Sequence, residues 1–360
     1  MGSKREAGQS ESGRGKRQDL ARWCHRTGVL SAVRAVRRLA RAEVRVLAYH
    51  RVLDIGNSER FVFDPALVSA TPERFREQMQ YIRDCYRPIS SNELIAFVEE
   101  GRALPRDAVI VTFDDGYDDN YRIAFPILRE LGVPATFFVS TGHIDSGLPY
   151  AYDWLVHMVC VAAAATLDVP EVGLRVALPP SLLARREIAS DLLDRIKWLD
   201  DAVQSKIIAR MERDWSLPRA VHPDCRPMTW DQLREMQAAG MDIGSHGVNH
   251  RMLGRLPAEE MIAEVRGSRL ALERELGHAP PTLSYPVGGP NAYSEAVIAA
   301  AREAGFRLAF NYISGSNPLP LTDRFALQRL PVEYETDIGW FAGIVAWPEL
   351  FSYPTRLRIG

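Results

Sequence analysis

The sequence has few of the features that mark secreted, redox-active or membrane-spanning proteins. Its 360 residues include four cysteines, at positions 24, 85, 160 and 225, and none of them forms a CxxC pair. The spacing therefore suggests neither a thiolate zinc site nor a redox pair. No apolar run approaches the roughly 20 residues of a membrane-spanning helix. Arginines interrupt every apolar stretch before Val44, so we expect no signal peptide and a cytoplasmic or peripheral membrane location.

Charge is distributed unevenly along the chain. The net charge is -2, yet residues 1–51 contain 13 Lys and Arg against 4 Asp and Glu. Residues 1–19 have almost no apolar side chains, which predicts a disordered basic tail. Residues 20–43 predict a basic amphipathic helix, with Val29, Val33, Val36 and Ala40 on one face and Arg34, Arg37, Arg38 and Arg41 on another.

This basic helix has two interpretations. It either packs on the protein with its arginines in solvent, or contacts an anionic membrane surface. Nucleic acid is not an expected partner, because the basic face has little aromatic interleaving and no recognition motif follows it.

The remainder of the chain alternates between short apolar runs and helical patterns. Strands are predicted at 44–49, 108–113, 135–139, 241–244, 282–285 and 307–310. We therefore expect an α/β fold over residues 44–335, with a helical insertion at 141–227 and a C-terminal extension at 336–360. A distorted (β/α) barrel of about seven parallel strands fits best, although a doubly wound open sheet has the same alternation.

Polar groups with metal-binding potential follow two of these strands. Asp114 and Asp115 come directly after residues 108–113, and His246 and His250 come after residues 241–244. The carboxyl ends of parallel strands share one rim, where binding groups collect. Adjacent carboxylates repel each other, and a cation relieves that repulsion. An Asp-Asp-Gly turn alone would fit helix capping, but the two groups together favour a metal site, with both histidines on one face of a helical turn.

These motifs resemble those of the polysaccharide deacetylases of carbohydrate esterase family 4. The matching segments are Thr112 to Gly116, reading TFDDG, and His246 to His250, reading HxxxH. The resemblance implies a hydrolase that removes acetyl groups from an N-acetylated polysaccharide, oligosaccharide or precursor. It also implies that Asp114 is the general base. Asp115, His246 and His250 would bind a divalent metal, with zinc the expected ion.

A third motif matches at Ser284 to Gly288. By resemblance, the backbone N–H of Val287 would stabilise the oxyanion, and Tyr117 and Tyr285 beside the motifs would contact the sugar. However, Ser284 stands where the family pattern carries an arginine that orients the base.

The family pattern also has a late histidine that serves as general acid, and here no histidine follows His278. His50, after the first predicted strand, is the candidate replacement, since an ordinary histidine pKa near 6.5 suits proton transfer. An ester needs less help at its leaving group than an amide does. An O-acetyl esterase is therefore an alternative, as is a noncatalytic carbohydrate-binding barrel.

Overall fold

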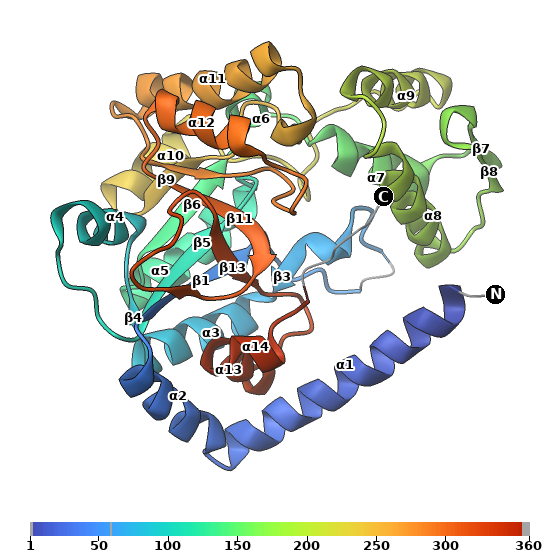
Figure 1. Cartoon of the computed structure of the whole chain (residues 1–360). Helices are drawn as coiled ribbons and strands as arrows, with labels where there is room; N and C mark the ends of the chain where they lie inside the picture. Colours follow the sequence, from blue (N-terminus) through green and yellow to red (C-terminus); the bar gives the residue numbers. More distant parts are fainter. Residues whose placement is uncertain (1–2, 58–59, 355–360) are drawn as a thin grey trace.

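Seven parallel strands close into a barrel surrounded by helices (Figure 1). The computed structural model describes residues 3–57 and 60–354, with side chains from residue 15 onward. In barrel order the strands are β1 (Glu43–Tyr49), β5 (Ala108–Phe113), β6 (Ala135–Val139), β9 (Asp242–Ser245), β10 (Thr282–Ser284), β11 (Leu308–Ser314) and β13 (Leu327–Pro331). Because β1 pairs with both β5 and β13, the sheet has no gap. The predicted barrel is confirmed, and the open sheet is not.

Short strands and helices complete the barrel. The short strands are β2 (Arg51–Val52), β3 (Val68–Ala70), β4 (Arg87–Pro88) and β12 (Asn317–Pro318). The covering helices are α3 (Pro72–Cys85), α4 (Ser91–Glu100), α5 (Phe125–Leu131), α10 (Trp230–Ala238), α11 (Ala258–Leu276) and α12 (Glu295–Ala304). A π-helical turn, Asn120–Ala124, leads into α5.

Alternate strand residues face the barrel interior or the helices, as the two-residue period of a strand requires. Val46, Ile110 and Phe138 belong to one buried cluster, whereas their neighbours on the strands pack in another. The same alternation carries Asp114, just after β5, and Arg329, within β13, to the interior. Both are buried, with Arg329 fully inaccessible to solvent.

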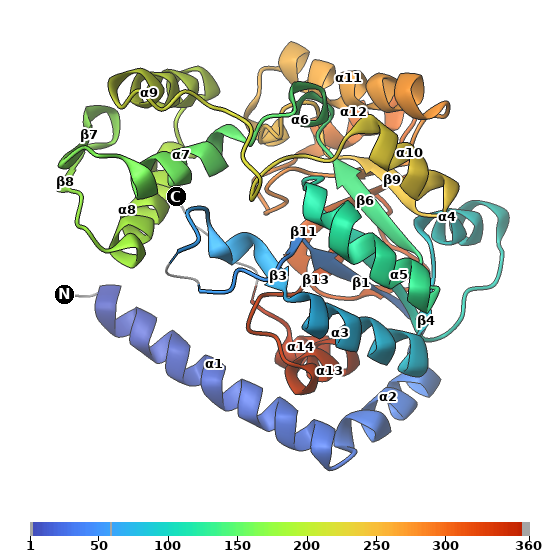
Figure 2. The same cartoon turned by 180° about the vertical axis from the view of Figure 1, so that it is seen from behind.

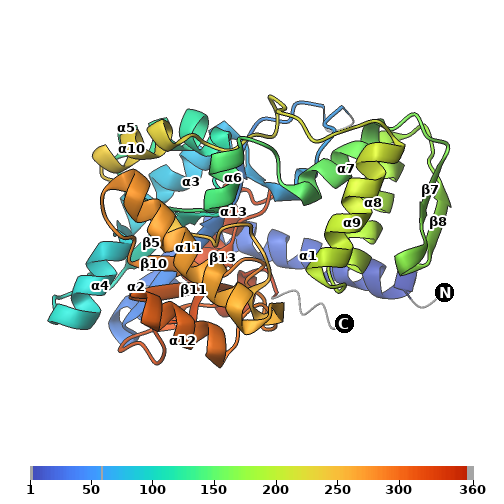
Figure 3. The same ribbon diagram turned by 90° about the horizontal axis from the view of Figure 1, so that it is seen from above.

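Most of the insertion lies to one side of the barrel (Figures 2 and 3), while its first helix packs beside α11. Its elements are α6 (Thr141–Ser146), α7 (Ala151–Val161), β7 (Thr166–Val169), β8 (Leu174–Ala177), α8 (Leu182–Ile196) and α9 (Asp201–Asp214). The antiparallel hairpin of β7 and β8 was not predicted. Trp154 and Leu155 of α7 share a buried cluster with Phe61 and Phe63, so the segment after β2 completes the core of the insertion.

The N-terminal segment lies against the C-terminal helices. It contains α1 (Ser3–Arg26) and α2 (Val29–Ala40), separated by Gly28 in a left-handed conformation. The Arg17 guanidinium donates to the backbone oxygens of Leu350 and Ser352, and Arg22 pairs with Asp337. These partners flank or belong to the C-terminal helices α13 (Ile338–Ala346) and α14 (Pro348–Phe351). Long-range contacts of Arg17 and Arg22 thus hold the end of α1 against the C-terminal helices, while the disorder of residues 1–19 stays a prediction.

Helix α2 presents an unexpected face to solvent. Arg34 donates to the backbone oxygen of Cys85, and Arg37 pairs with Glu43 and Glu349, so these two arginines face the protein. Val36 and Leu39 are 65% and 78% exposed. In the described part of the chain, none of the helices combines the length and apolarity needed to cross a bilayer.

Candidate metal centre

Asp115, His246 and His250 converge at the carboxyl ends of β5 and β9. The Oδ1 atom of Asp115 lies 3.4 Å from Nε2 of His246 and 3.3 Å from Nε2 of His250. That oxygen is buried and accepts no hydrogen bond. Ligands about 2.0–2.1 Å from a tetrahedral ion lie about 3.4 Å from each other. The spacing and the unpartnered oxygen both fit a divalent metal such as zinc.

The backbone around this centre is conformationally unusual. Among the described residues, four non-glycine residues have a left-handed φ, and three of them are Asp115 at 76°, His250 at 56° and Val287 at 66°. Such residues cost about 1–3 kcal/mol each and gather at functional sites. With Gly247 also at a φ of 77°, the HxxxH segment is a loop. The expected helical turn was wrong, although both imidazoles still converge.

Side chains from neighbouring helices hold the HxxxH loop in place. Oε2 of Glu264, on α11, accepts from the backbone N–H groups of Val248 and Asn249 at 2.8 and 2.9 Å. Its Oε1 accepts from Asn249 Nδ2 at 2.8 Å. The Ser140 hydroxyl donates to the His246 backbone oxygen. Sequence reasoning missed Glu264, because nothing in the α11 pattern distinguishes it from an exposed acid.

The hydrogen bond of His246 and the burial of His250 both suit metal ligands. His246 Nδ1 donates to the Ser284 backbone oxygen at 2.8 Å, which leaves Nε2 as the acceptor. Burial lowers the pKa of His250 to about 4. Burial also opposes the charged form of His246, but Asp114 and Asp115 outweigh it and raise its pKa. A bound cation would oppose that rise by favouring the neutral ring.

Asp114 is held by Arg329, a residue that sequence reasoning did not identify. Nη1 of Arg329 donates to Oδ1 of Asp114 at 2.8 Å, and Nη2 donates to Oδ2 at 2.7 Å. Burial alone would raise the pKa of Asp114, but Arg329, His246 and His50 outweigh burial and lower it. Asp114 is therefore ionised and can accept a proton.

His50 lies at the end of β1 and faces the same rim. Its ring centroid is 5.4 Å from that of Tyr312, and its backbone N–H donates to the Ser69 hydroxyl. Its side chain is half-buried. Burial opposes the charged form of Asp115, but the neighbouring histidines outweigh burial and lower its pKa.

Val287 is on the loop after β10, with its side chain 54% exposed and its backbone in the left-handed region. Its N–H remains the candidate oxyanion donor.

The two tyrosines expected to contact sugar are both buried. The Tyr117 hydroxyl donates to Asp153, and the Tyr285 hydroxyl donates to the Phe325 backbone oxygen. Both rings are at most 1% exposed. This corrects the expectation: the positions beside the motifs supply packing rather than a sugar-binding surface.

A different tyrosine reaches the centre from the insertion side. The Tyr150 hydroxyl donates to the Asp115 backbone oxygen at 2.9 Å, and its ring stacks on His143 with centroids 3.7 Å apart. Burial lowers the pKa of His143 to about 3, so that ring is neutral. The segment preceding α7 thus supports the left-handed Asp115 turn.

Comparison with known proteins agrees with this geometry. The family model described as "Polysaccharide deacetylase" matches residues 101–309. YxkH of Bacillus subtilis (strain 168), which is named for that family, is 21% identical over 271 residues, covering 74% of this chain and 63% of YxkH. The poly-beta-1,6-N-acetyl-D-glucosamine N-deacetylase of Escherichia coli (strain K12) is 34% identical over 101 residues, covering 28% of this chain and 14% of that enzyme. The chain spans less than two thirds of the length of these relatives.

Solved structures share the fold at low sequence identity. The Streptococcus pyogenes deacetylase PplD, solved in complex with acetate, has a TM-score of 0.55 and 18% identity, covering 82% of this chain and 95% of PplD. IcaB from Ammonifex degensii has a TM-score of 0.53 and 19% identity, covering 85% of this chain and 97% of IcaB.

Proposed function

Because this chain belongs to the polysaccharide deacetylase family, we propose that it hydrolyses acetamido groups on a polysaccharide, oligosaccharide or precursor, releasing acetate. The observation that carries the proposal is the unpartnered Asp115 Oδ1 between two histidine Nε2 atoms, with ionised Asp114 beside it. Asp115, His246 and His250 would hold a divalent metal, with zinc the best match to one carboxylate and two imidazoles.

The residues at the rim would have separate roles in the reaction. When bound, the metal would polarise the acetyl carbonyl and lower the pKa of the attacking water. Asp114 would accept the proton of that water, because Arg329 keeps its carboxylate ionised and oriented. The Val287 N–H would donate to the oxyanion of the tetrahedral intermediate.

Protonation of the leaving amine is assigned to His50. An amine is a poor leaving group unless it receives a proton as the carbon–nitrogen bond breaks. His50 lies at the end of β1 with its ring centroid 5.4 Å from that of Tyr312, and an imidazolium can donate a proton to a departing amine. This acid favours amide hydrolysis over the O-acetyl ester alternative.

Acetate release from a panel of substrates tests this function. The panel contains N-acetylated glucosamine oligomers and acetylated xylan, and mass spectrometry of the products locates the bond that is cleaved. We expect loss of 42 mass units, the net loss of one acetyl group, from amino sugars only, at a rate that Asp114→Asn lowers about 10²-fold or more. Cleavage confined to xylan would instead assign an O-acetyl esterase. Binding without acetate release would assign a noncatalytic barrel.

We further propose that residues 20–43 contact an anionic membrane surface. Val36 and Leu39 are exposed on α2, as Trp23 is on α1 at 58%. Arg38 and Arg41, each with 62% of its side chain exposed, lie beside the apolar residues of α2. Apolar side chains rimmed by arginines suit a bilayer interface with anionic lipid headgroups.

Vesicle co-sedimentation tests the membrane contact. The intact protein should bind phosphatidylglycerol vesicles and bind phosphatidylcholine vesicles weakly. Leu39→Glu should reduce binding to the anionic vesicles, because it places a charge on the contacting face. The matched control is Leu270→Glu, a 60% exposed leucine on α11. Equal binding by both variants would contradict the membrane contact.

A further inference from the structure

We propose that Arg329 is the positioning residue that orients Asp114 for proton transfer, from β13, in place of an arginine at position 284. The proposal rests on the proposed function, because it takes Asp114 as the general base. Neither the family match, which ends at residue 309, nor the sequence motifs include Arg329.

Every N–H group of Arg329 has an acceptor inside the barrel. Two bonds form the parallel fork with Asp114, at 2.8 and 2.7 Å. The three remaining bonds go to the Asn311 backbone oxygen, the Thr112 hydroxyl and the Ser284 hydroxyl. A guanidinium with five bonds in fixed directions has one orientation available to it. It therefore fixes the plane of the Asp114 carboxylate as well as its charge.

Ser284 explains how Arg329 fits at this place. Its hydroxyl lies 3.0 Å from Nη2 of Arg329, so a small side chain at position 284 leaves room for the guanidinium. The backbone oxygen of the same residue binds Nδ1 of His246. Ser284 thus contacts Arg329 through its hydroxyl and His246 through its backbone oxygen. The two sequence features, a serine at 284 and an arginine at 329, form one interaction.

A purely electrostatic role for Arg329 would differ from positioning in one respect. A lysine keeps the positive charge beside Asp114 but cannot form the two-pronged contact. The ring centroid of Tyr312 lies 5.2 Å from the Arg329 guanidinium carbon. Arg329→Lys therefore separates charge from geometry.

Steady-state kinetics of Arg329→Lys are the first part of the test. We expect kcat to fall about 100-fold, as a misplaced catalytic group does, while KM changes less than threefold. Bound zinc per chain should match the wild type. The matched control is Arg45→Lys, which alters another buried ion-paired arginine, on β1 beside Glu43. It should leave kcat within about twofold, because Arg45 pairs with Glu43 and not with Asp114.

Rescue is the second part of the test. In the double variant Ser284→Arg with Arg329→Ser, the arginine moves to the position that the family pattern predicts. We expect the kcat of the double variant to be at least tenfold higher than the kcat of Arg329→Ser. Thermal unfolding of each variant shows whether recovery reflects orientation or merely folding.

The proposal is overturned if Arg329→Lys retains the wild-type kcat while Asp114→Asn is inactive. It is also overturned if the double variant folds and binds zinc but recovers nothing. Failure of the proposed function gives a different result, because the wild type would then release no acetate from any member of the panel.

Discussion

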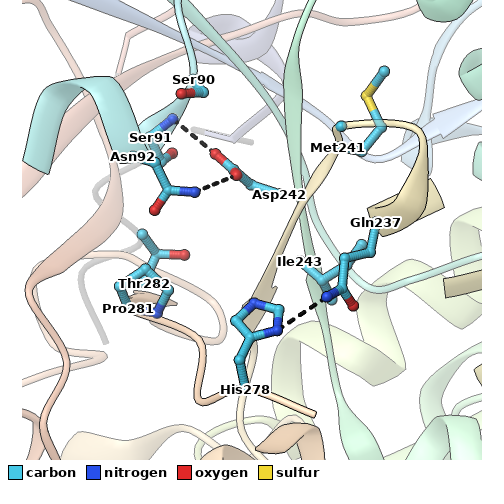
Figure 4. Close-up of a pocket in the computed structure, with 11 residues that line it drawn as sticks. Ser90, Ser91, Asn92, Gln237, Met241, Asp242, Ile243, His278, Pro281 and Thr282 are labelled. Carbon is cyan, nitrogen blue, oxygen red and sulfur yellow. Dashed lines mark hydrogen bonds between the residues drawn. The ribbon is translucent and has the colours of Figure 1, made fainter. Parts of the chain in front are cut away.

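The two ends of β9 carry similar side chains in opposite circumstances. At its amino end, Asp242 accepts from the Ser91 backbone N–H at 3.0 Å and from Asn92 Nδ2 at 2.6 Å, and His278 bonds to Gln237 (Figure 4). At its carboxyl end, His246 faces an Asp115 oxygen that accepts no hydrogen bond. The side chains of Asp242 and His278 thus have hydrogen-bond partners, whereas the buried Asp115 oxygen has none and faces two imidazole nitrogens, an arrangement that suits a metal ligand.

Loss of one of the three proposed metal ligands should have the largest effect on activity. Asp115→Ala or His246→Ala should lower kcat/KM by about 10³-fold or more, because Lewis-acid stabilisation is worth several kcal/mol. Acetate release under saturating zinc measures this. Asp242→Ala is the matched change at the other end of β9 and should leave kcat/KM within about threefold. An equal loss in both would remove the distinction between the two ends.

Loss of Glu264, which holds the loop that carries the proposed metal ligands, should have an intermediate effect. Glu264→Ala removes three hydrogen bonds from the loop that carries His250. We expect zinc affinity to fall about 10–100-fold, as is typical when outer-shell partners are removed. Competition with a chromophoric chelator measures the affinity. Glu273→Ala, an exposed acid on the same helix, is the control, and an equal loss there would contradict a specific role for Glu264.

At the amino end, the expected effect is on stability alone. Asp242→Ala leaves the Ser91 N–H and the Asn92 amide without their acceptor. We expect a loss of about 1–3 kcal/mol in the free energy of unfolding. Urea denaturation measures it. If Asp242→Ala unfolded at the same urea concentration as the wild type, the two hydrogen bonds to Asp242 would contribute nothing to stability.

The pH dependence of stability should also identify Asp242. Burial raises its pKa above the ordinary 3.8, although Ser91 and Asn92 oppose the rise. The folded state then holds a proton more tightly than the unfolded state, so this contribution to stability decreases as pH rises from 3.8 through the folded-state pKa. In Asp242→Asn that decrease should be absent. If the free energy of unfolding changed with pH equally in the wild type and in Asp242→Asn across this range, the raised pKa would be contradicted.

The smallest effect is expected at His278. Its side chain is exposed and bonds to Gln237, so His278→Ala should change stability by less than about 0.5 kcal/mol. Thermal denaturation and acetate release should both match the wild type. A marked loss of activity would show that the pocket in Figure 4 takes part in catalysis.

The sequence predicted which side chains gather at the carboxyl ends of β5 and β9 better than it predicted their surroundings. Asp115, His246 and His250 follow apolar strands that the pattern reveals, so their shared rim could be inferred. The backbone between them could not, because the left-handed φ of His250 depends on packing against α11. The predicted helical turn failed for that reason.

Arg329 was missed because of its environment. Strand β13 reads Leu-Gln-Arg-Leu-Pro, and a charged residue at an interior position removes the apolar alternation that marks a strand. Only closure of the barrel brings Arg329 beside Asp114, 215 residues away in the sequence. The interpretation with solvated arginines likewise does not hold for Arg34 and Arg37, because both find partners far along the chain.

Metal content of three purified proteins tests the central claim most directly. After incubation with zinc and removal of the excess, elemental analysis should find about one zinc per chain in the wild type and in Asp242→Ala, and essentially none in His246→Ala. A wild type without bound metal, or a His246→Ala variant that retains it, would contradict a metal centre at the carboxyl end of β9.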